Sequence, residues 1–206
     1  MKNVCAIVLA PIHGLLRFRQ RKGFGVQSPF AQSFLQDVVY EHHSYYAYQS
    51  LPSAYADSPQ GGASYSPKQL RFLFRLANFC QPPVIWLPAE SAEALQLWVK
   101  AGCQSAGLRT YRDEAELQVL LSTFQSKGMV IVEHLQRYGD FLLEMLPKLD
   151  GDVVVAIRGV NRCNSDGKFW QRLVAMPQST VSFDLLTYGI LFLNPRFSKQ
   201  HYKLYL

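Results

Sequence analysis

The sequence lacks two features that often reveal a function, clustered cysteines and long apolar runs. Its four cysteines, Cys5, Cys80, Cys103 and Cys163, form no CxxC pair and no Cys/His spacing. This scatter excludes a recognisable zinc motif and is typical of reduced thiols in a cytoplasmic protein. The apolar stretch VCAIVLAPI near the start is too short to span a bilayer, and no convincing signal-peptide cleavage site accompanies it. We therefore expect no membrane span and a cytoplasmic location.

Charged residues are also scarce, at 17% against 49% hydrophobic residues, which excludes a disordered chain. Thirteen Phe, eleven Tyr and three Trp supply enough apolar surface for a sizeable core. The formal net charge is +6, and part of it lies in one run, Arg17, Arg19, Arg21 and Lys22. A basic run can attract nucleic acid, but no Arg/Gly repeat or RNA-binding aromatic motif supports that role. A solvated helix face is the simpler interpretation.

Residues 1–80 are expected to form an N-terminal helical extension. Ser28 and Ser66 each precede a proline, which is the pattern of a helix N-cap followed by the first helical residue. Gln69 stands where a capping box requires Glu or Gln. Between these two helix starts, residues 40–65 are rich in Tyr, Ser, Pro and Gly, which predicts a long loop that can act as a lid.

From residue 81 onward, Val- and Ile-rich runs alternate with amphipathic segments. Strands are expected at 84–87, 107–111, 129–133, 152–157, 181–186, 190–193 and 202–206. Apolar strands separated by helices indicate an α/β, Rossmann-like domain over 81–206, with a mostly parallel sheet covered on both faces. A turn expected at Tyr188-Gly189 makes the pair 181–186 and 190–193 an antiparallel hairpin.

Several stretches carry a family resemblance. GFGVQSPF at 23–30 is similar to a Gly-x-Gly-Val-His-Ser-Pro-Phe signature, with Gln27 in place of His, and residues 181–206 resemble the same group's C-terminal hairpin and closing strand. Further matches, recognised mainly by spacing, are Arg137-Tyr138, residues 146–149 and Trp170. The group is a bacterial set of class I S-adenosylmethionine-dependent methyltransferases, related to small-molecule O-methyltransferases. The resemblance covers most of the chain and implies their fold, with S-adenosylmethionine as the cofactor of an active member.

The turn after the first strand departs from that family. The family has Glu-Leu-Gly and further small residues there, which let the cofactor approach the backbone beside a helix N-terminus. This chain has Leu87, Pro88, Ala89, Glu90 and Ser91, and we interpret these five as a vestigial cofactor-binding loop. Pro88 lacks an N–H donor, and Ala89 and Glu90 bring side chains to the place of the cofactor. Glu90 either bonds a ribose hydroxyl or amino group of the cofactor, or only favours the positive helix end.

Two further departures concern catalysis and metal binding. In place of the family's Asp-Gly-Asn-His, the chain has Glu133-His134-Leu135-Gln136, so Glu133 and His134 are the candidate catalytic residues, as ligand or base. The alternative is that both are ordinary polar residues at a strand end. In place of an Asp-Asp pair, the chain has Arg158-Gly159, and an arginine has the wrong sign for a divalent cation. We therefore expect no metal site.

The segment at about 107–127 has room for one strand–helix unit, where a full class I methyltransferase has two. The second unit of the family supplies an acidic residue for the ribose. Asp113 and Glu114 follow the strand of this chain, but the sequence leaves open which of the two units is present.

Three functions are compatible with these observations. The first is a degenerate methyltransferase-like pseudoenzyme that has lost its cofactor and metal sites and binds a protein or small-molecule partner, or acts as a scaffold. The second is an active methyltransferase with an atypical pocket, using Glu90 or Glu133 for S-adenosylmethionine and His134 as base. The third is a basic nucleic-acid-binding module, which rests on Arg17–Lys22. The first is preferred because the second needs three independent replacements to be compensated. A homo-oligomer is compatible with each.

Overall fold

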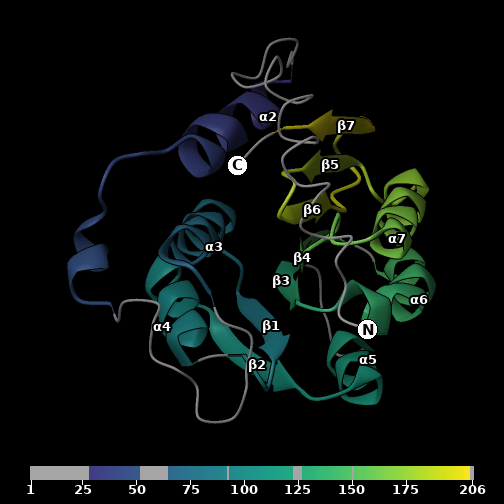
Figure 1. Cartoon of the computed structure of the whole chain (residues 1–206), viewed down its shortest axis with the longest axis horizontal. Helices are drawn as coiled ribbons and strands as arrows, with labels where there is room; N and C mark the ends of the chain where they lie inside the picture. The colour runs from purple at the N-terminus through teal and green to yellow at the C-terminus, as the bar shows by residue number, and fades with distance from the viewer. Residues whose placement is uncertain (1–27, 52–64, 92, 123–126, 150, 205–206) are drawn as a thin grey trace. The chain divides into compact units, whose positions relative to one another are not determined.

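The computed structural model of the protein describes residues 28–51, 65–91, 93–122, 127–149 and 151–204. It is an α/β structure with a seven-stranded, mostly parallel sheet of strand order β2-β1-β3-β4-β6-β5-β7 (Figure 1). This architecture agrees with the predicted Rossmann-like class. The described chain divides into two compact units, here called the N-terminal unit (Ser28–Val130) and the C-terminal unit (Ile131–Leu206). No helix in the described ranges has the length and apolar character needed to cross a membrane.

The N-terminal unit begins with helices whose starts follow from the sequence. These are α2 (Pro29–Phe34), the π-helix η2 (Leu35–Val39), the 3-10 helix η3 (Tyr46–Gln49) and α3 (Pro67–Cys80). The Ser28 hydroxyl accepts a hydrogen bond from the N–H of Ala31 at 3.4 Å. Ser66 and Gln69 form the complete capping box at the start of α3. Both predicted N-caps are therefore confirmed, and they depend on contacts only three residues apart.

The sheet of the N-terminal unit follows α3. Its elements are β1 (Val84–Pro88), α4 (Glu93–Gly102), β2 (Gly107–Tyr111), α5 (Glu114–Ser122) and the first part of β3 (Lys127–Val132), whose last two residues belong to the C-terminal unit. Strand β1 pairs in parallel with both β2 and β3. Helices α3 and α4 lie side by side in Figure 1. They approach closely at Gly102, where a Cβ would lie 2.4 Å from the carbonyl oxygen of Phe74. One strand–helix unit, β2 and α5, lies between α4 and β3, as the segment length predicted.

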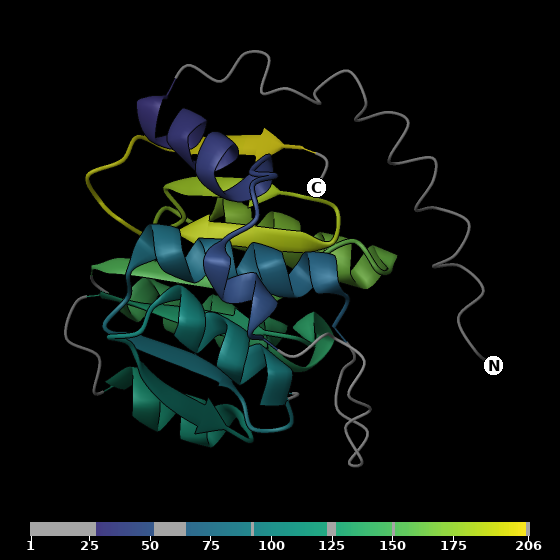
Figure 2. The ribbon, with the colours of Figure 1, turned by 90° about the vertical axis from the view of Figure 1, so that its left-hand side faces the viewer.

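The C-terminal unit continues the alternation and ends in antiparallel strands. It contains α6 (Leu135–Met145), the 3-10 helix η4 (Leu146–Lys148), β4 (Asp152–Arg158), α7 (Asn164–Ala175), β5 (Val181–Asp184), β6 (Tyr188–Phe192) and β7 (Gln200–Lys203). Strand β6 pairs antiparallel with β4 and with β5, and β5 pairs in parallel with β7. Figure 2 shows β5, β6 and β7 in yellow-green to yellow, side by side. The predicted hairpin is therefore confirmed as β5–β6.

The turn of this hairpin is not at Tyr188-Gly189, so that prediction was wrong. Both residues belong to β6, and the chain reverses through Leu186, which has a φ of 70°. The Asp184 carboxylate accepts the N–H of Leu186 at 3.1 Å and so stabilises the tight turn. Gly189 has a packing role instead, because a Cβ there would lie 2.6 Å from Cζ3 of Trp170. The glycine signal was real, but its cause is a close approach rather than a turn.

Candidate functional site

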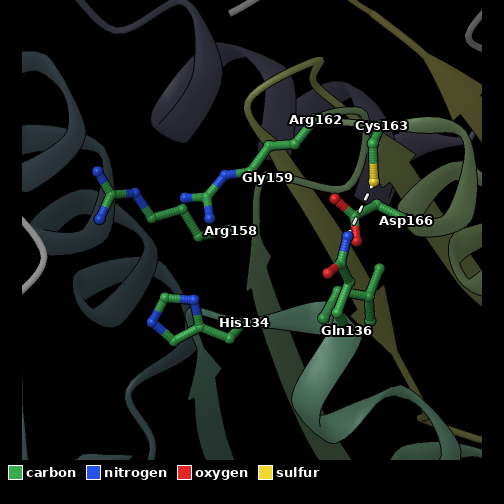
Figure 3. Close-up of a pocket in the computed structure, with 8 residues that line it drawn as sticks. His134, Gln136, Arg158, Gly159, Arg162, Cys163 and Asp166 are labelled. Atoms are coloured by element: carbon green, nitrogen blue, oxygen red, sulfur yellow. Dashed lines mark hydrogen bonds between the residues drawn. The ribbon is translucent and has the colours of Figure 1, made fainter. Parts of the chain in front are cut away.

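A cavity of about 280 Å³ lies in the C-terminal unit, where β3 and β4 end and α6 and α7 begin (Figure 3). The polar side chains that line it are His134, Gln136, Arg158, Arg162, Cys163 and Asp166. In open α/β sheets, ligands bind outside the carboxyl ends of the strands, beside helix N-termini that favour negative charge. Position and lining together make this cavity the candidate functional site.

Two arginines give one side of the cavity its positive charge. Arg158 is the last residue of β4 and is half-buried, and Arg162 lies at the end of the following turn and is exposed. Gly159 allows this arrangement, because it has a φ of 75° and a Cβ there would lie 2.1 Å from Nε of Arg162. The Gly159 N–H donates to the carbonyl of Thr187 at 2.7 Å, which ties the turn to the residue before β6. The Arg162 side chain thus packs directly against the backbone at Gly159, which leaves no room for a side chain at that position.

Asp166 lies across from these cations. In Figure 3 the Arg158 and Arg162 side chains and the His134 ring lie on one side, and the Asp166 carboxylate lies on the other. Asp166 belongs to the first turn of α7, where the helix macrodipole stabilises an anion. It is 4% exposed, and within the described structure its Oδ1 has no hydrogen-bond partner. A buried acceptor of this kind is costly unless a donor reaches it, so it can receive an N–H or O–H of a ligand.

A small polar network joins the starts of α6 and α7 beside the cavity. The Gln136 amide donates to Sγ of Cys163 at 3.0 Å and to the Ser165 hydroxyl at 3.3 Å. Cys163 and Ser165 are themselves 3.0 Å apart through their side-chain Sγ and Oγ. This network holds the wall in place between two helices. It also engages Cys163 in hydrogen bonds, so the thiol acts as a structural group here.

The structure separates the two candidate catalytic residues, Glu133 and His134. His134 is exposed and lines the cavity just before α6, whereas Glu133 is 1% exposed and is not part of the lining. Burial raises the pKa of the neighbouring Tyr188 hydroxyl, and the Glu133 carboxylate raises it further, while Arg158 opposes both effects. The Glu133 carboxylate therefore influences the buried Tyr188 hydroxyl and does not line the cavity. His134 is the member of the pair that is accessible to a ligand.

In the predicted vestigial loop, residues 87–91, backbone N–H groups form hydrogen bonds within the protein. Leu87 and Pro88 are buried in β1, and Pro88 pairs with Tyr111 of β2. The N–H of Ala89 donates to the Tyr111 carbonyl at 2.7 Å, and the N–H of Ser91 donates to the Pro88 carbonyl at 3.0 Å. Ala89 and Glu90 are exposed, and Ser91 is buried. Two N–H groups of this turn are thus already satisfied, and Pro88 has none to offer.

Asp113, the first acidic residue after β2, has a local role. Oδ1 of Asp113 accepts the N–H of Glu116 at 2.8 Å, and Oε2 of Glu116 accepts the N–H of Arg112 at 2.7 Å. Asp113 thus acts as a side-chain cap at the start of α5, and the Glu116 carboxylate binds the backbone of Arg112, the residue before the cap. The Asp113 carboxylate is therefore engaged in helix capping.

No group of three or more His, Cys, Asp or Glu side chains within the described ranges is arranged to hold a metal ion. The basic run at Arg17–Lys22 and the first part of the GFGVQSPF motif lie outside the residues that the structure describes. No protein-family model matches the chain, and no curated protein sequence matches it.

Of the residues that line this cavity, the sequence singled out His134 as a candidate catalytic residue and Arg158 as a reason to expect no metal site. It gave no role to Arg162, Asp166, Gln136 or Cys163. An acidic residue in the first turn of the helix after β4 was a usable signal for Asp166. The other three carry no local signal, because their role follows from how α6, α7 and the turn after β4 pack together.

Proposed function

We propose that this protein is a methyltransferase-like pseudoenzyme. It does not use S-adenosylmethionine and binds a small anionic ligand instead. The observation that carries this proposal is the pair Arg158 and Arg162 at the carboxyl end of β4. The resembling methyltransferases have a carboxylate pair where this chain has Arg158 and Gly159. Two guanidinium groups beside two helix N-termini attract an anion and repel a divalent cation.

The turn after β1 supports the loss of the cofactor. A nucleotide-like cofactor needs close access to the backbone and free N–H donors at this turn. Here the N–H groups of Ala89 and Ser91 bond within the protein, and Pro88 supplies none. The residues of this loop therefore do not fit S-adenosylmethionine.

The acidic residue after β2 supports the same conclusion. In the resembling family such a residue bonds the ribose. Asp113 corresponds to that residue by position, because it follows the strand beside β1. Its Oδ1 accepts the N–H of Glu116 at 2.8 Å and so caps α5. Engaging it with a ribose would remove a cap that contributes about 1 kcal/mol.

The ligand of the C-terminal cavity is expected to combine a negative charge with a donor group. Arg158 and Arg162 bind the anionic part, and the buried Oδ1 of Asp166 receives an N–H or O–H from the same molecule. A volume of about 280 Å³ restricts it to a small molecule. A hydroxy acid or amino acid has this combination of groups.

One observation favours the alternative, an active methyltransferase with an atypical pocket. His134 lines the cavity and is exposed, so its imidazole is accessible to a substrate as a general base. This alternative shares the position of the site with our proposal and differs from it in the requirement for S-adenosylmethionine.

Calorimetric titration of the full chain with S-adenosylmethionine and S-adenosylhomocysteine separates the two functions. We expect no heat of binding at millimolar ligand, in a sample shown to be folded by circular dichroism. Binding in the micromolar range, about −8 kcal/mol, would refute the proposal. In that case Glu90→Gln and Glu133→Gln should weaken the binding, and His134→Gln should abolish methyl transfer while leaving cofactor binding intact.

A further inference from the structure

A second cavity, of about 510 Å³, lies within the N-terminal unit. Side chains from two segments line it. The charged and imidazole-bearing ones are Glu41, His42, His43, Lys68, Arg71 and Arg75. Among these described residues, three permanent cations face one carboxylate. The cavity is within the size range of sites that hold nucleotide-sized molecules.

The three cations share one face of α3, with Lys68 and Arg71 in its first half and Arg75 just beyond the middle. Lys68, Arg71 and Arg75 are spaced i, i+3 and i+7, so their side chains lie above one another along the helix. Like charges at this spacing repel each other, and cations near a helix N-terminus oppose the macrodipole. The first turn of α3 contains no acidic residue to offset them. The arrangement therefore lowers the stability of the helix, and a bound anion would reverse that effect.

Arg75 is the most informative of the three, because it is only 7% exposed and still lines the cavity. Its Nε donates to the carbonyl of Val38 at 2.8 Å, which orients the guanidinium. Within the described ranges, no carboxylate oxygen forms an ion pair with Arg71 or Arg75. A buried cation without a counter-charge is costly, and its forked donors suit the oxygens of an anion.

The neighbouring groups contact these cations or each other without bringing a carboxylate to Arg71 or Arg75 within the described ranges. The guanidinium of Arg71 lies over the Tyr48 ring, 5.3 Å from its centroid. The Glu41 carboxylate binds the His43 backbone N–H and, at 2.7 Å, its Nδ1. The His43 backbone hydrogen bond is the main reason that the pKa of Glu41 lies below its ordinary value. Glu41 is thus engaged with His43, while the cations of α3 face the cavity.

We propose that this cavity binds the phosphate group of a small molecule. A phosphate presents three terminal oxygens to separate donors, which suits two guanidinium groups and an ammonium that approach from one helix face. A single carboxylate is planar and is satisfied by one arginine fork. The inference does not depend on the function proposed for the C-terminal cavity, because it uses other residues in the other unit.

Calorimetric titration of the full chain with inorganic pyrophosphate at low ionic strength tests this site. We expect Arg71→Gln to weaken pyrophosphate binding roughly tenfold or more, as loss of charge-assisted hydrogen bonds requires. Arg71→Lys keeps the positive charge but loses the forked pair of guanidinium donors. Its affinity for pyrophosphate should lie between those of the wild type and Arg71→Gln. Both substitutions are at an exposed position, so the fold should be retained. Citrate, whose carboxylates carry a similar charge, should bind more weakly than pyrophosphate.

The matched control is Arg109→Gln, which removes one exposed positive charge from β2 of the same unit without touching the cavity. It should bind pyrophosphate as the wild type does. An equal loss in Arg109→Gln would show a general effect of net charge and overturn the proposal. So would the absence of binding at millimolar pyrophosphate, or tighter binding of citrate. Binding that is lost in Arg162→Gln but kept in Arg71→Gln would assign the ligand to the C-terminal cavity instead.

Discussion

At the scale of single residues, two glycines near the candidate site differ in whether their positions could accept a side chain. Gly159 has a φ of 75°, and a Cβ there would lie 2.1 Å from Nε of Arg162. Gly167 lies inside α7, and a Cβ there would meet no atom within 4 Å. Both look alike in the sequence. The first is needed by backbone conformation and by the position of Arg162, whereas the second has no such requirement.

Gly159→Ala should therefore lower the free energy of unfolding by about 1–3 kcal/mol, from the strained backbone and the displaced arginine. Gly167→Ala should leave it unchanged or raise it by up to about 1 kcal/mol, because alanine favours the helix. Urea unfolding of both variants, followed by circular dichroism, measures the difference. Equal stabilities of the two variants would contradict this account of the turn after β4.

At the scale of elements, the start of α3 shows how a helix carries an unfavourable charge pattern. The Ser66 hydroxyl accepts the N–H of Gln69 at 3.3 Å, and the Gln69 side chain accepts the N–H of Ser66 at 2.9 Å. Pro67 stands at the first helical position, where its missing N–H costs nothing. This capping offsets part of the cost of Lys68 and Arg71 near the same helix end.

Ser66→Ala should lower the free energy of unfolding by about 1 kcal/mol, since it leaves the N–H of Gln69 without its cap. Ser33→Ala, at an exposed position inside α2, is the control and should change it by less than about 0.5 kcal/mol. Thermal and urea unfolding measure the stability of both variants. A loss in Ser33→Ala as large as that in Ser66→Ala would argue against a specific role for the capping box.

At the scale of the whole molecule, buried and half-buried tyrosines link stability to alkaline pH. Burial raises the pKa of tyrosine hydroxyls in both units, those of Tyr45, Tyr48, Tyr188 and Tyr202. The unfolded chain loses these protons near the ordinary value of 10.0, whereas the folded chain keeps them to higher pH. The unfolded state is therefore favoured as pH rises above about 10. The stabilising contribution is fully present below that pH.

Tyr188→Phe keeps the buried ring and removes the hydroxyl that titrates. Between about pH 10 and pH 11.5, the stability of this variant should fall less steeply than that of the wild type, by up to about 1.4 kcal/mol per pH unit. Tyr46→Phe is the control, because Tyr46 is 91% exposed, and it should follow the wild type. Urea unfolding at a series of pH values provides the test. Parallel stability curves for Tyr188→Phe and the wild type would refute it.

The features that the sequence by itself determined are those with local causes. The caps at Ser28 and Ser66 depend on atoms three residues away, and the alternation of apolar strands with amphipathic helices predicted the α/β class. The β5–β6 hairpin was also predictable, because short apolar strands separated by a few residues pair antiparallel. The departures at 87–91 and at Arg158 were visible in the sequence as changes of residue type.

The tertiary structure alone decided the features whose causes lie far apart in the chain. Gly189 was misread as a turn residue because the atom that requires it belongs to Trp170, on another element. The buried Asp166 carboxylate faces Arg158 and Arg162 through the packing of α7 beside the end of β4. Arg75 becomes a buried cation because η2 covers it and Val38 accepts its hydrogen bond. Burial and charge proximity are properties of packing, and packing joins residues that local patterns keep separate.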